Sequence, residues 1–178
     1  MANETFLKIE ENIAVLYLNF PEKRNAISRV LLESLDFSLD SIAINKDIRV
    51  LLIASSDDKA FCAGADLKER MTMSHEEVLK FLDDVKRIFC KLESLNIPTI
   101  AVINGDAYGG GLELALCCDI RTISDHAKIG LTETKLGIIP GAGGTQRLTR
   151  LIGESRAKEL IFSARKIGVV EAEKFGMV

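Results

Sequence analysis

The sequence predicts a single α/β domain with a mainly parallel sheet, and two observations support this prediction. Its 178 residues suit one domain, because single domains commonly contain about 100–200 residues. Short apolar runs that suit strands alternate along the chain with longer stretches whose apolar residues recur at helical spacing. Such alternation is typical of α/β proteins with parallel strands. We therefore treat residues 1–178 as one domain.

The first part of the chain contains a predicted hairpin followed by a helix. Two short apolar-rich runs, Phe6–Glu10 and Ile13–Asn19, suit the two strands of a hairpin. After a polar break, apolar residues recur at helical spacing from Ile27 to Ile42 and predict a helix of about four turns.

Two further strands flank a second predicted helix. Val50–Ala54 is a continuous apolar run, which is typical of a strand buried on both faces, and Thr99–Ile103 is a second buried strand. Between them, Ser74 and Glu77 form a capping-box pattern, in which each side chain satisfies a free backbone N–H of the other. An apolar stripe follows this helix start, and Pro98 closes the helix.

The second half of the chain is organised around two glycine clusters, each of which precedes a short stretch with helical character. Periodicity leaves two arrangements open, a spiral of β-β-α units and a doubly wound sheet. The clusters are Gly109–Gly111 and Gly141–Gly144, and the predicted helices are Leu112–Leu116, Thr145–Ile152, Glu154–Phe162 and Val169–Phe175.

Composition and charge exclude several classes of function. The net charge of −3, without a run of Lys and Arg, gives no basic face for nucleic acid. The four cysteines form no CxxC pair and lie away from both histidines, so we expect reduced, mostly buried thiols and no metal site. The sequence also shows no signal peptide and no run of about 18 apolar residues, which predicts a cytoplasmic protein that does not span a membrane.

The first glycine cluster suits chemistry at a helix N-terminus. The glycines from Gly109 to Gly111 let a ligand approach backbone N–H groups that have no partner within the helix. These groups lie at the positive end of the helix dipole, which suits a developing oxyanion. Glu113 lies on the same face as Gly110 about one turn later and could hold a water molecule there. The alternative is a tight helix–strand packing site with Glu113 as a partner of the dipole.

Two other segments carry weaker signals when each is taken alone. In Phe61–Lys68, small residues allow close backbone approach, Ala65 could supply a second N–H donor, and Lys68 could reach a ligand phosphate. The commoner finding in such a segment is a simple turn with a solvated lysine. Glu133 precedes an apolar run and a Pro-Gly turn, and by residue type it is most simply a solvated or capping residue.

Together, three motifs resemble the crotonase (enoyl-CoA hydratase/isomerase) superfamily. They are Ala-Phe-Cys-Ala-Gly-Ala-Asp-Leu-Lys at 60–68, Asn-Gly-Asp-Ala-Tyr-Gly-Gly-Gly-Leu-Glu-Leu-Ala at 104–115, and Leu-Gly-Ile-Ile-Pro-Gly-Ala-Gly-Gly-Thr-Gln-Arg-Leu at 136–148. Their combination is specific, and the resemblance runs from Phe6 to the end of the chain. Phe61–Arg70 and Ala157–Arg165 are especially similar to the 3-methylglutaconyl-CoA hydratase branch, whose animal member is also called AU-binding homologue.

The resemblance implies a crotonase-like spiral of β-β-α units and a hydratase that adds water across the C2=C3 bond of a 2-enoyl-CoA. It implies an oxyanion hole made by the N–H groups of Ala65 and Gly110, with Glu113 as the base that holds water and Glu133 as the acid. Two acids favour hydration, because related isomerases often keep only one. The coenzyme A is part of the substrate, so no separate cofactor is expected. The implied CoA contacts are Lys23, Arg24, Ala26, Ala63, Asp66, Leu67, Lys68 and Gly141.

The resemblance also bears on partners. Family members continue beyond the position that matches Val178 into C-terminal helices that help form a homotrimer or hexamer and cover the acyl pocket, so we expect this segment to be lacking here. The lysine-rich helix that binds RNA in the AU-binding homologue corresponds here to a helix with no lysine, which argues against RNA binding. This helix carries Arg29, Glu33, Asp36 and Asp40.

Three functions therefore remain in view from the sequence. The leading one is a hydratase of fatty-acid or branched-chain amino-acid (leucine) degradation, acting on a substrate such as 3-methylglutaconyl-CoA. An enoyl-CoA delta-isomerase is the alternative enzyme. The alternative of another class is a truncated, inactive module that binds CoA or RNA.

Overall fold

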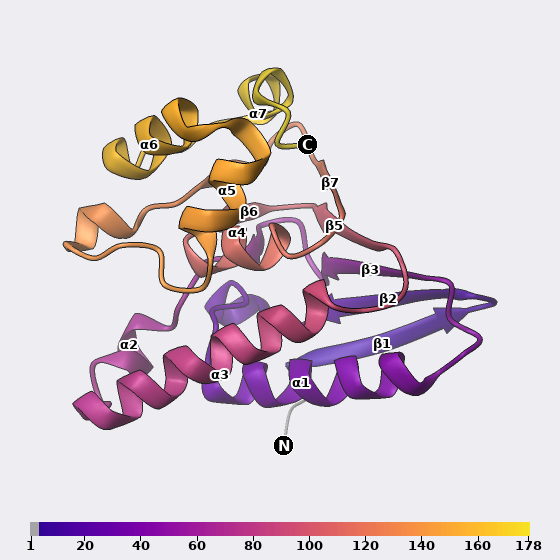
Figure 1. Cartoon of the computed structure of the whole chain (residues 1–178). Helices are drawn as coiled ribbons and strands as arrows, with labels where there is room; N and C mark the ends of the chain where they lie inside the picture. Colours follow the sequence, from indigo (N-terminus) through magenta and orange to yellow (C-terminus); the bar gives the residue numbers. More distant parts are fainter. Residues whose placement is uncertain (1–3) are drawn as a thin grey trace.

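The computed structural model describes residues 4–178 and shows a chain built from a repeated β-β-α unit. Four such units follow one another, and two further helices complete the described chain (Figure 1). The strands are β1 Thr5–Glu10, β2 Ile13–Leu18, β3 Val50–Ser55, β4 Ala60–Cys62, β5 Thr99–Ile103, β6 Asp106–Tyr108, β7 Ile120–Ile123 and β8 Ile129–Gly130. The α-helices are α1 Arg29–Ile44, α2 Leu67–Arg70, α3 His75–Glu93, α4 Gly110–Ala115, α5 Gly144–Ile152, α6 Glu154–Ser163 and α7 Val169–Phe175, and the 3-10 helices are η1 Pro21–Lys23 and η2 Glu133–Leu136.

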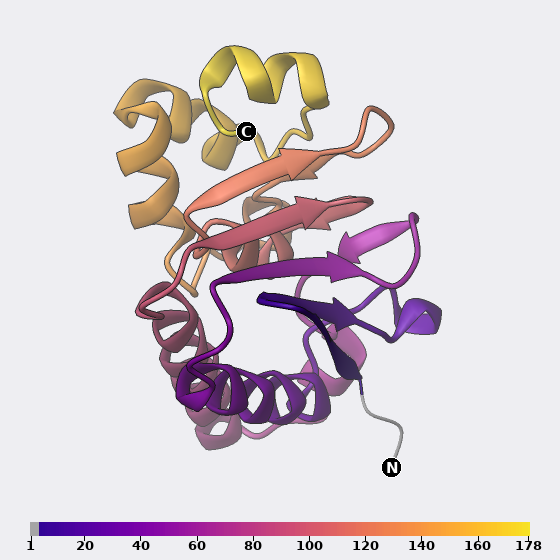
Figure 2. The ribbon, with the colours of Figure 1, turned by 90° about the vertical axis from the view of Figure 1, so that its right-hand side faces the viewer.

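The strands form two sheets, which confirms the spiral of β-β-α units. The larger sheet has the order β1-β2-β3-β5-β7, and the smaller one has the order β4-β6-β8. Apart from the β1–β2 hairpin, all neighbouring strands in both sheets run parallel. From β3 onward, the first strand of each unit joins the larger sheet and the second joins the smaller one. Figure 2 shows the larger sheet with its strands one above another.

The helices α1 and α3 lie side by side against one face of the larger sheet (Figures 1 and 2). Leu51 and Ile53 of β3 are fully buried in this core. Leu52, between them, points the other way, and it is half-buried together with its neighbours in register, Val15 and Ile100. The prediction that β3 is buried on both faces is therefore wrong, because the described helices cover one face only.

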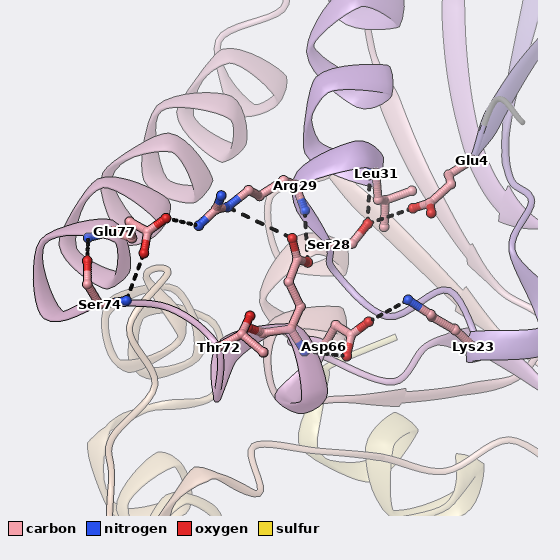
Figure 3. A network of polar contacts seen from close by, with 10 residues as sticks. Glu4, Lys23, Ser28, Arg29, Leu31, Asp66, Thr72, Ser74 and Glu77 are labelled. Atoms are coloured by element: carbon pink, nitrogen blue, oxygen red, sulfur yellow. Dashed lines mark hydrogen bonds and ion pairs between the residues drawn. The ribbon is translucent and has the colours of Figure 1, made fainter. Parts of the chain in front are cut away.

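The predicted helix starts are confirmed to within two residues. The first helix begins at Arg29 rather than Ile27, because Ser28 is its N-cap and accepts a hydrogen bond from the N–H of Leu31 at 3.0 Å. The capping box at the start of α3 is present, and Figure 3 shows both of its hydrogen bonds, between Ser74 and Glu77. That helix ends at Glu93, so Pro98 lies beyond its end and does not close it.

The remaining helices, α6 and α7, lie at the opposite end of the molecule from α1 (Figures 1 and 2). All four cysteines are free, and three of them are buried while Cys90 is exposed, as the sequence predicts for mostly buried thiols. Among residues 4–178, no helix has both the length and the apolar character needed to cross a membrane.

Candidate active site

The small sheet determines where the candidate site forms. Its strands β4, β6 and β8 run parallel, so their carboxyl ends lie at one edge of the sheet. In open α/β sheets, ligands bind outside the carboxyl ends of the strands. Residues that follow each of the three strands line one cavity of about 620 Å³, and α3 contributes a further part of the lining. The predicted site residues that the cavity brings together are Ala63, Ala65, Leu67, Gly110, Glu113, Glu133 and Gly141.

The two predicted N–H donors belong to neighbouring segments of this cavity lining. A side-chain carbon added to Gly110 would lie 3.9 Å from the nitrogen of Ala65. Bonds on either side hold the Ala65 segment, since Gly64 accepts from the N–H of Ile27 and Asp66 donates to the carbonyl of Ile27. Within residues 4–178, neither Ala65 nor Gly110 uses its own N–H in a hydrogen bond to another residue. Both donors are therefore available to a ligand.

Glu113 is buried, with 3% of its surface exposed, and lies in α4. Its Oε1 accepts hydrogen bonds from the backbone N–H groups of Ala142 and Gly144, at 2.8 and 2.7 Å. The carboxylate therefore binds the start of α5 rather than acting as a dipole partner of its own helix. No described residue donates a hydrogen bond to Oε2. Burial raises the pKa of Glu113, whereas the two N–H donors and the charge of Arg147 act to lower it.

Glu133 is also buried, with 9% of its surface exposed, so the expectation of a solvated or capping residue is wrong. Its Oε2 is buried without a hydrogen-bond partner in the described structure. Burial, and then the charge of Glu113, raises the pKa of Glu133 to about 7. A side-chain carbon on Gly109 would lie 3.1 Å from Oε1 of Glu133, and the φ of Gly109 is +51°. Only glycine meets both conditions at little cost.

The other predicted CoA contacts lie beside the cavity rather than in its lining. Lys23 and Asp66 form an ion pair at 3.0 Å, which Figure 3 shows, and Asp66 also caps α2. The N–H of Ala63 donates to the carbonyl of Arg24, so the two segments run together. Lys68 is exposed and forms no ion pair within the described residues. The residues that do not line the cavity are Lys23, Arg24, Ala26, Asp66 and Lys68.

Comparison with known proteins shows the family of the chain. The model of the enoyl-CoA hydratase/isomerase family matches residues 8–178. The chain belongs to the enoyl-CoA hydratase/isomerase family. It is 50% identical over 171 residues to the mitochondrial methylglutaconyl-CoA hydratase of Homo sapiens, covering 95% of this chain and 50% of that protein. It is 48% identical over 168 residues to an enoyl-CoA isomerase/hydratase of Zymoseptoria tritici, covering 93% of this chain and 55% of that protein.

Solved structures in this enoyl-CoA hydratase/isomerase family share the fold. The crystal structure of an enoyl-CoA hydratase from Bacillus anthracis superposes with a TM-score of 0.96 at 45% identity, covering 98% of this chain and 68% of that chain. The chain spans between 50% and 65% of the length of the curated relatives that it matches. The predicted trimer or hexamer and the predicted cytoplasmic location stay predictions.

The cavity also contains residues that the sequence analysis did not select. Phe81 and Val85 of α3 line it. Arg70, at the end of α2, lines it as well, and its guanidinium lies 5.5 Å from the centre of the Phe81 ring. No local pattern marks Arg70, because its role depends on α2 and α3 meeting in space.

The acidic residues on α1 are largely occupied by cations of α3. Arg87 and Lys91 both contact Asp36, and Lys91 also contacts Asp40 at 2.7 Å. These pairs hold the two helices together and add no basic surface to α1. The prediction that this chain does not bind RNA stays a prediction.

The raised pKa of Glu133 has a consequence for stability that does not depend on activity. A folded-state pKa of about 7 exceeds the unfolded value of roughly 4.3, so the folded state loses stability as the pH rises between these values. Glu133→Gln removes this loss. We expect the melting temperature of the variant, relative to wild type, to increase from about pH 4.5 to about pH 7 and to level off above.

Thermal unfolding followed by circular dichroism across this pH range measures the effect. Glu173→Gln, at an exposed position, is the matched control for loss of one carboxyl group. The same pH dependence of the melting temperature in both variants would show that Glu133 titrates like a solvated carboxyl.

Proposed function

We propose that this chain carries a hydratase site that adds water across the C2=C3 bond of a 2-enoyl-CoA thioester. One observation supports this most directly: two buried carboxyl groups, Glu113 and Glu133, line the same cavity as two backbone N–H groups without acceptors. Such a reaction needs a base that takes a proton from water, an acid that protonates C2, and donors that stabilise negative charge on the thioester oxygen. The cavity contains a candidate for each of these groups.

The N–H groups of Ala65 and Gly110 would receive the thioester carbonyl oxygen. When water attacks C3, the electrons of the double bond move toward this oxygen and form an enolate. Two fixed donors in a cavity stabilise that charge more than the neutral carbonyl of the substrate, and such differential stabilisation accelerates the reaction. Removing one such donor typically costs about 10²–10³ in kcat.

The environments of the two acids suit different roles. Glu113 accepts two N–H bonds that favour its ionised form, so it would take a proton from water as the oxygen bonds to C3. Glu133 has an unpartnered oxygen and a pKa of about 7, so it would carry a proton and deliver it to C2 of the enolate. In one turnover Glu113 gains a proton and Glu133 loses one. After the product leaves, both carboxyl groups must exchange protons with water to return to their starting states.

The proposed CoA contacts lie next to this site. Lys68 is exposed without an ion pair among the described residues, and the Lys23–Asp66 pair lies where the two segments run together. We propose that Lys68 and the backbone of residues 23–26 contact the CoA moiety. Hydration of enoyl-CoA thioesters would place the chain in fatty-acid or leucine degradation, as its resemblance to the family implies.

The lining of the cavity supports a proposal for the acyl group. Arg70 is the cationic residue in the described lining of the cavity. No described carboxylate forms an ion pair with Arg70. A guanidinium beside an apolar wall suits an acyl group with a carboxylate at its far end. 3-Methylglutaconyl-CoA is such a thioester, and relatives of this chain are named as methylglutaconyl-CoA hydratases. We propose a dicarboxylic 2-enoyl-CoA as the preferred substrate.

Hydration is measured by the loss of ultraviolet absorbance as the conjugated double bond disappears. An isomerase remains the second candidate, because one relative is named as an isomerase/hydratase. Product analysis with a 3-enoyl-CoA separates the two, since an isomerase gives conjugated product without added water. A chain that binds CoA but catalyses neither hydration nor isomerisation would match the third function, an inactive binding module.

Removing one N–H donor tests the proposed oxyanion hole. Gly110→Pro deletes the N–H at the first position of α4, where proline is tolerated. We expect folded protein whose kcat/KM falls by about 10²–10³. Gly110→Ala is the matched control, because it adds a side-chain carbon at 2.9 Å from Cδ1 of Ile27 but keeps the N–H. Equal activity of the two variants would contradict the assignment of this donor.

Replacing the cation tests the proposed acyl group. In Arg70→Met, the ratio of kcat/KM for 3-methylglutaconyl-CoA to that for crotonyl-CoA should fall at least about tenfold, because a charged hydrogen bond is lost with one substrate only. The ratio for Arg70→Lys should lie between those of wild type and Arg70→Met, since lysine keeps the charge but lacks the planar fork of N–H donors. An unchanged ratio would show that Arg70 does not recognise the acyl group.

A further inference from the structure

We propose that Arg147 is a positioning residue for Glu113, acting through the turn that precedes α5, and that Glu93 is the anchor of Arg147. This inference rests on the proposed function of Glu113 and extends it to residues that do not line the cavity. The turn holds Glu113 by two N–H bonds, from Ala142 and Gly144. Arg147 holds the turn.

Arg147 lies in the first turns of α5, and 11% of its side chain is exposed. Its Nη1 donates to the carbonyl oxygen of Ala142 at 2.8 Å. The backbone N–H of Ala142 in turn donates to Oε1 of Glu113 at 2.8 Å. A displacement of Ala142 would therefore alter the hydrogen bonds to both side chains, which couples the guanidinium to the carboxylate through one residue.

The guanidinium also restricts the middle of the turn. A side-chain carbon at Gly143 would lie 2.0 Å from Nη1 of Arg147, so the guanidinium fills the space next to this glycine. Gly143 has a φ of +99°, which favours glycine. The turn from Ala142 to Gly144 is thus packed against Arg147 and bonded to Glu113.

Glu93 fixes the other end of the guanidinium. Its Oε2 accepts from Nη2 of Arg147 at 2.6 Å. Glu93 is the last residue of α3, the helix whose Phe81 and Val85 line the cavity. The ion pair therefore connects the helix of the cavity wall with the turn that holds Glu113.

The charge of Arg147 adds a second effect. It favours ionised Glu113 and so opposes the increase in pKa that burial causes. A residue needed only for folding would leave the titration of Glu113 unchanged once the variant is folded. The two roles therefore differ in a measurable pH dependence.

The experiment compares Arg147→Met with Arg147→Lys in the hydration assay across pH. For Arg147→Met we expect kcat to fall about 10–100-fold, because a misplaced catalytic group commonly costs up to about 10². KM should change much less. Activity of a base is lost as pH falls through its pKa, so loss of the cation should shift the acidic limb of the pH profile to higher pH. Arg147→Lys should lower kcat and leave that limb in place.

Two further variants keep the proposal testable where Arg147→Met does not fold. Glu93→Gln removes the charge of a half-exposed partner and should lower kcat by a smaller factor than Arg147→Met. Arg150→Met is the matched control, because Arg150 lies exposed on the same helix and forms no ion pair within the described residues; it should behave as wild type. Unchanged kcat in Glu93→Gln and Arg147→Lys, or an acidic limb of a folded Arg147→Met that does not move, would overturn the proposal.

A readout besides activity separates this inference from the proposed function. Carboxyl carbon NMR on protein labelled at glutamate follows the titration of Glu113 directly. A higher pKa of Glu113 in Arg147→Met than in wild type would support the positioning role even if wild type hydrates no enoyl-CoA. An active wild type with the same Glu113 pKa in both proteins would overturn the positioning role alone.

Discussion

The hydrogen bonds from the N–H groups of Ala142 and Gly144 to Oε1 of Glu113 are the interaction on which the candidate site depends. A carboxylate with this little exposure would be expensive to ionise without donors of this kind. The donors stand at the start of α5, where backbone N–H groups lack partners within the helix. The carboxylate therefore gains donors, and the backbone N–H groups gain an acceptor. Burial is the main cause of the raised pKa of Glu133, and a charge retained on Glu113 raises this pKa further.

The spiral fold explains how residues so distant in sequence meet at one place. Each β-β-α unit adds one strand to the smaller sheet, and these strands run parallel. The segments after β4, β6 and β8 consequently reach the same edge. The first two supply backbone N–H groups and Glu113, and the third supplies Glu133. Helix α3, which crosses from the larger sheet, completes the wall with apolar side chains.

Much of the fold could be predicted from the sequence, since long elements carry their own patterns. The helix of Ser74 and Glu77 was predicted from its cap, and β1, β2, β3 and β5 of the larger sheet from apolar runs, whereas β7 was not predicted. The smaller sheet was not predicted, because β4, β6 and β8 contain only two or three residues, too few for any periodicity. Glu133 shows the same limit, because its carboxyl group lies beside Gly109, a residue distant in the sequence. The partners of Glu113 lie 29 and 31 residues away, beyond any local pattern.

Glu113 and Glu133 are both buried but have different surroundings, and we expect the fold to keep the two carboxyl groups in different protonation states. Carboxyl carbon NMR of wild-type protein labelled at glutamate, with assignments from Glu113→Gln and Glu133→Gln, measures both titrations in one sample. We predict that Glu133 titrates near pH 7. Glu113 should lose its proton at lower pH, because two N–H groups donate to its Oε1 while Oε2 of Glu133 has no described partner. A Glu133 that titrates with the solvated glutamates, or a Glu113 that holds its proton to higher pH than Glu133, would contradict the account.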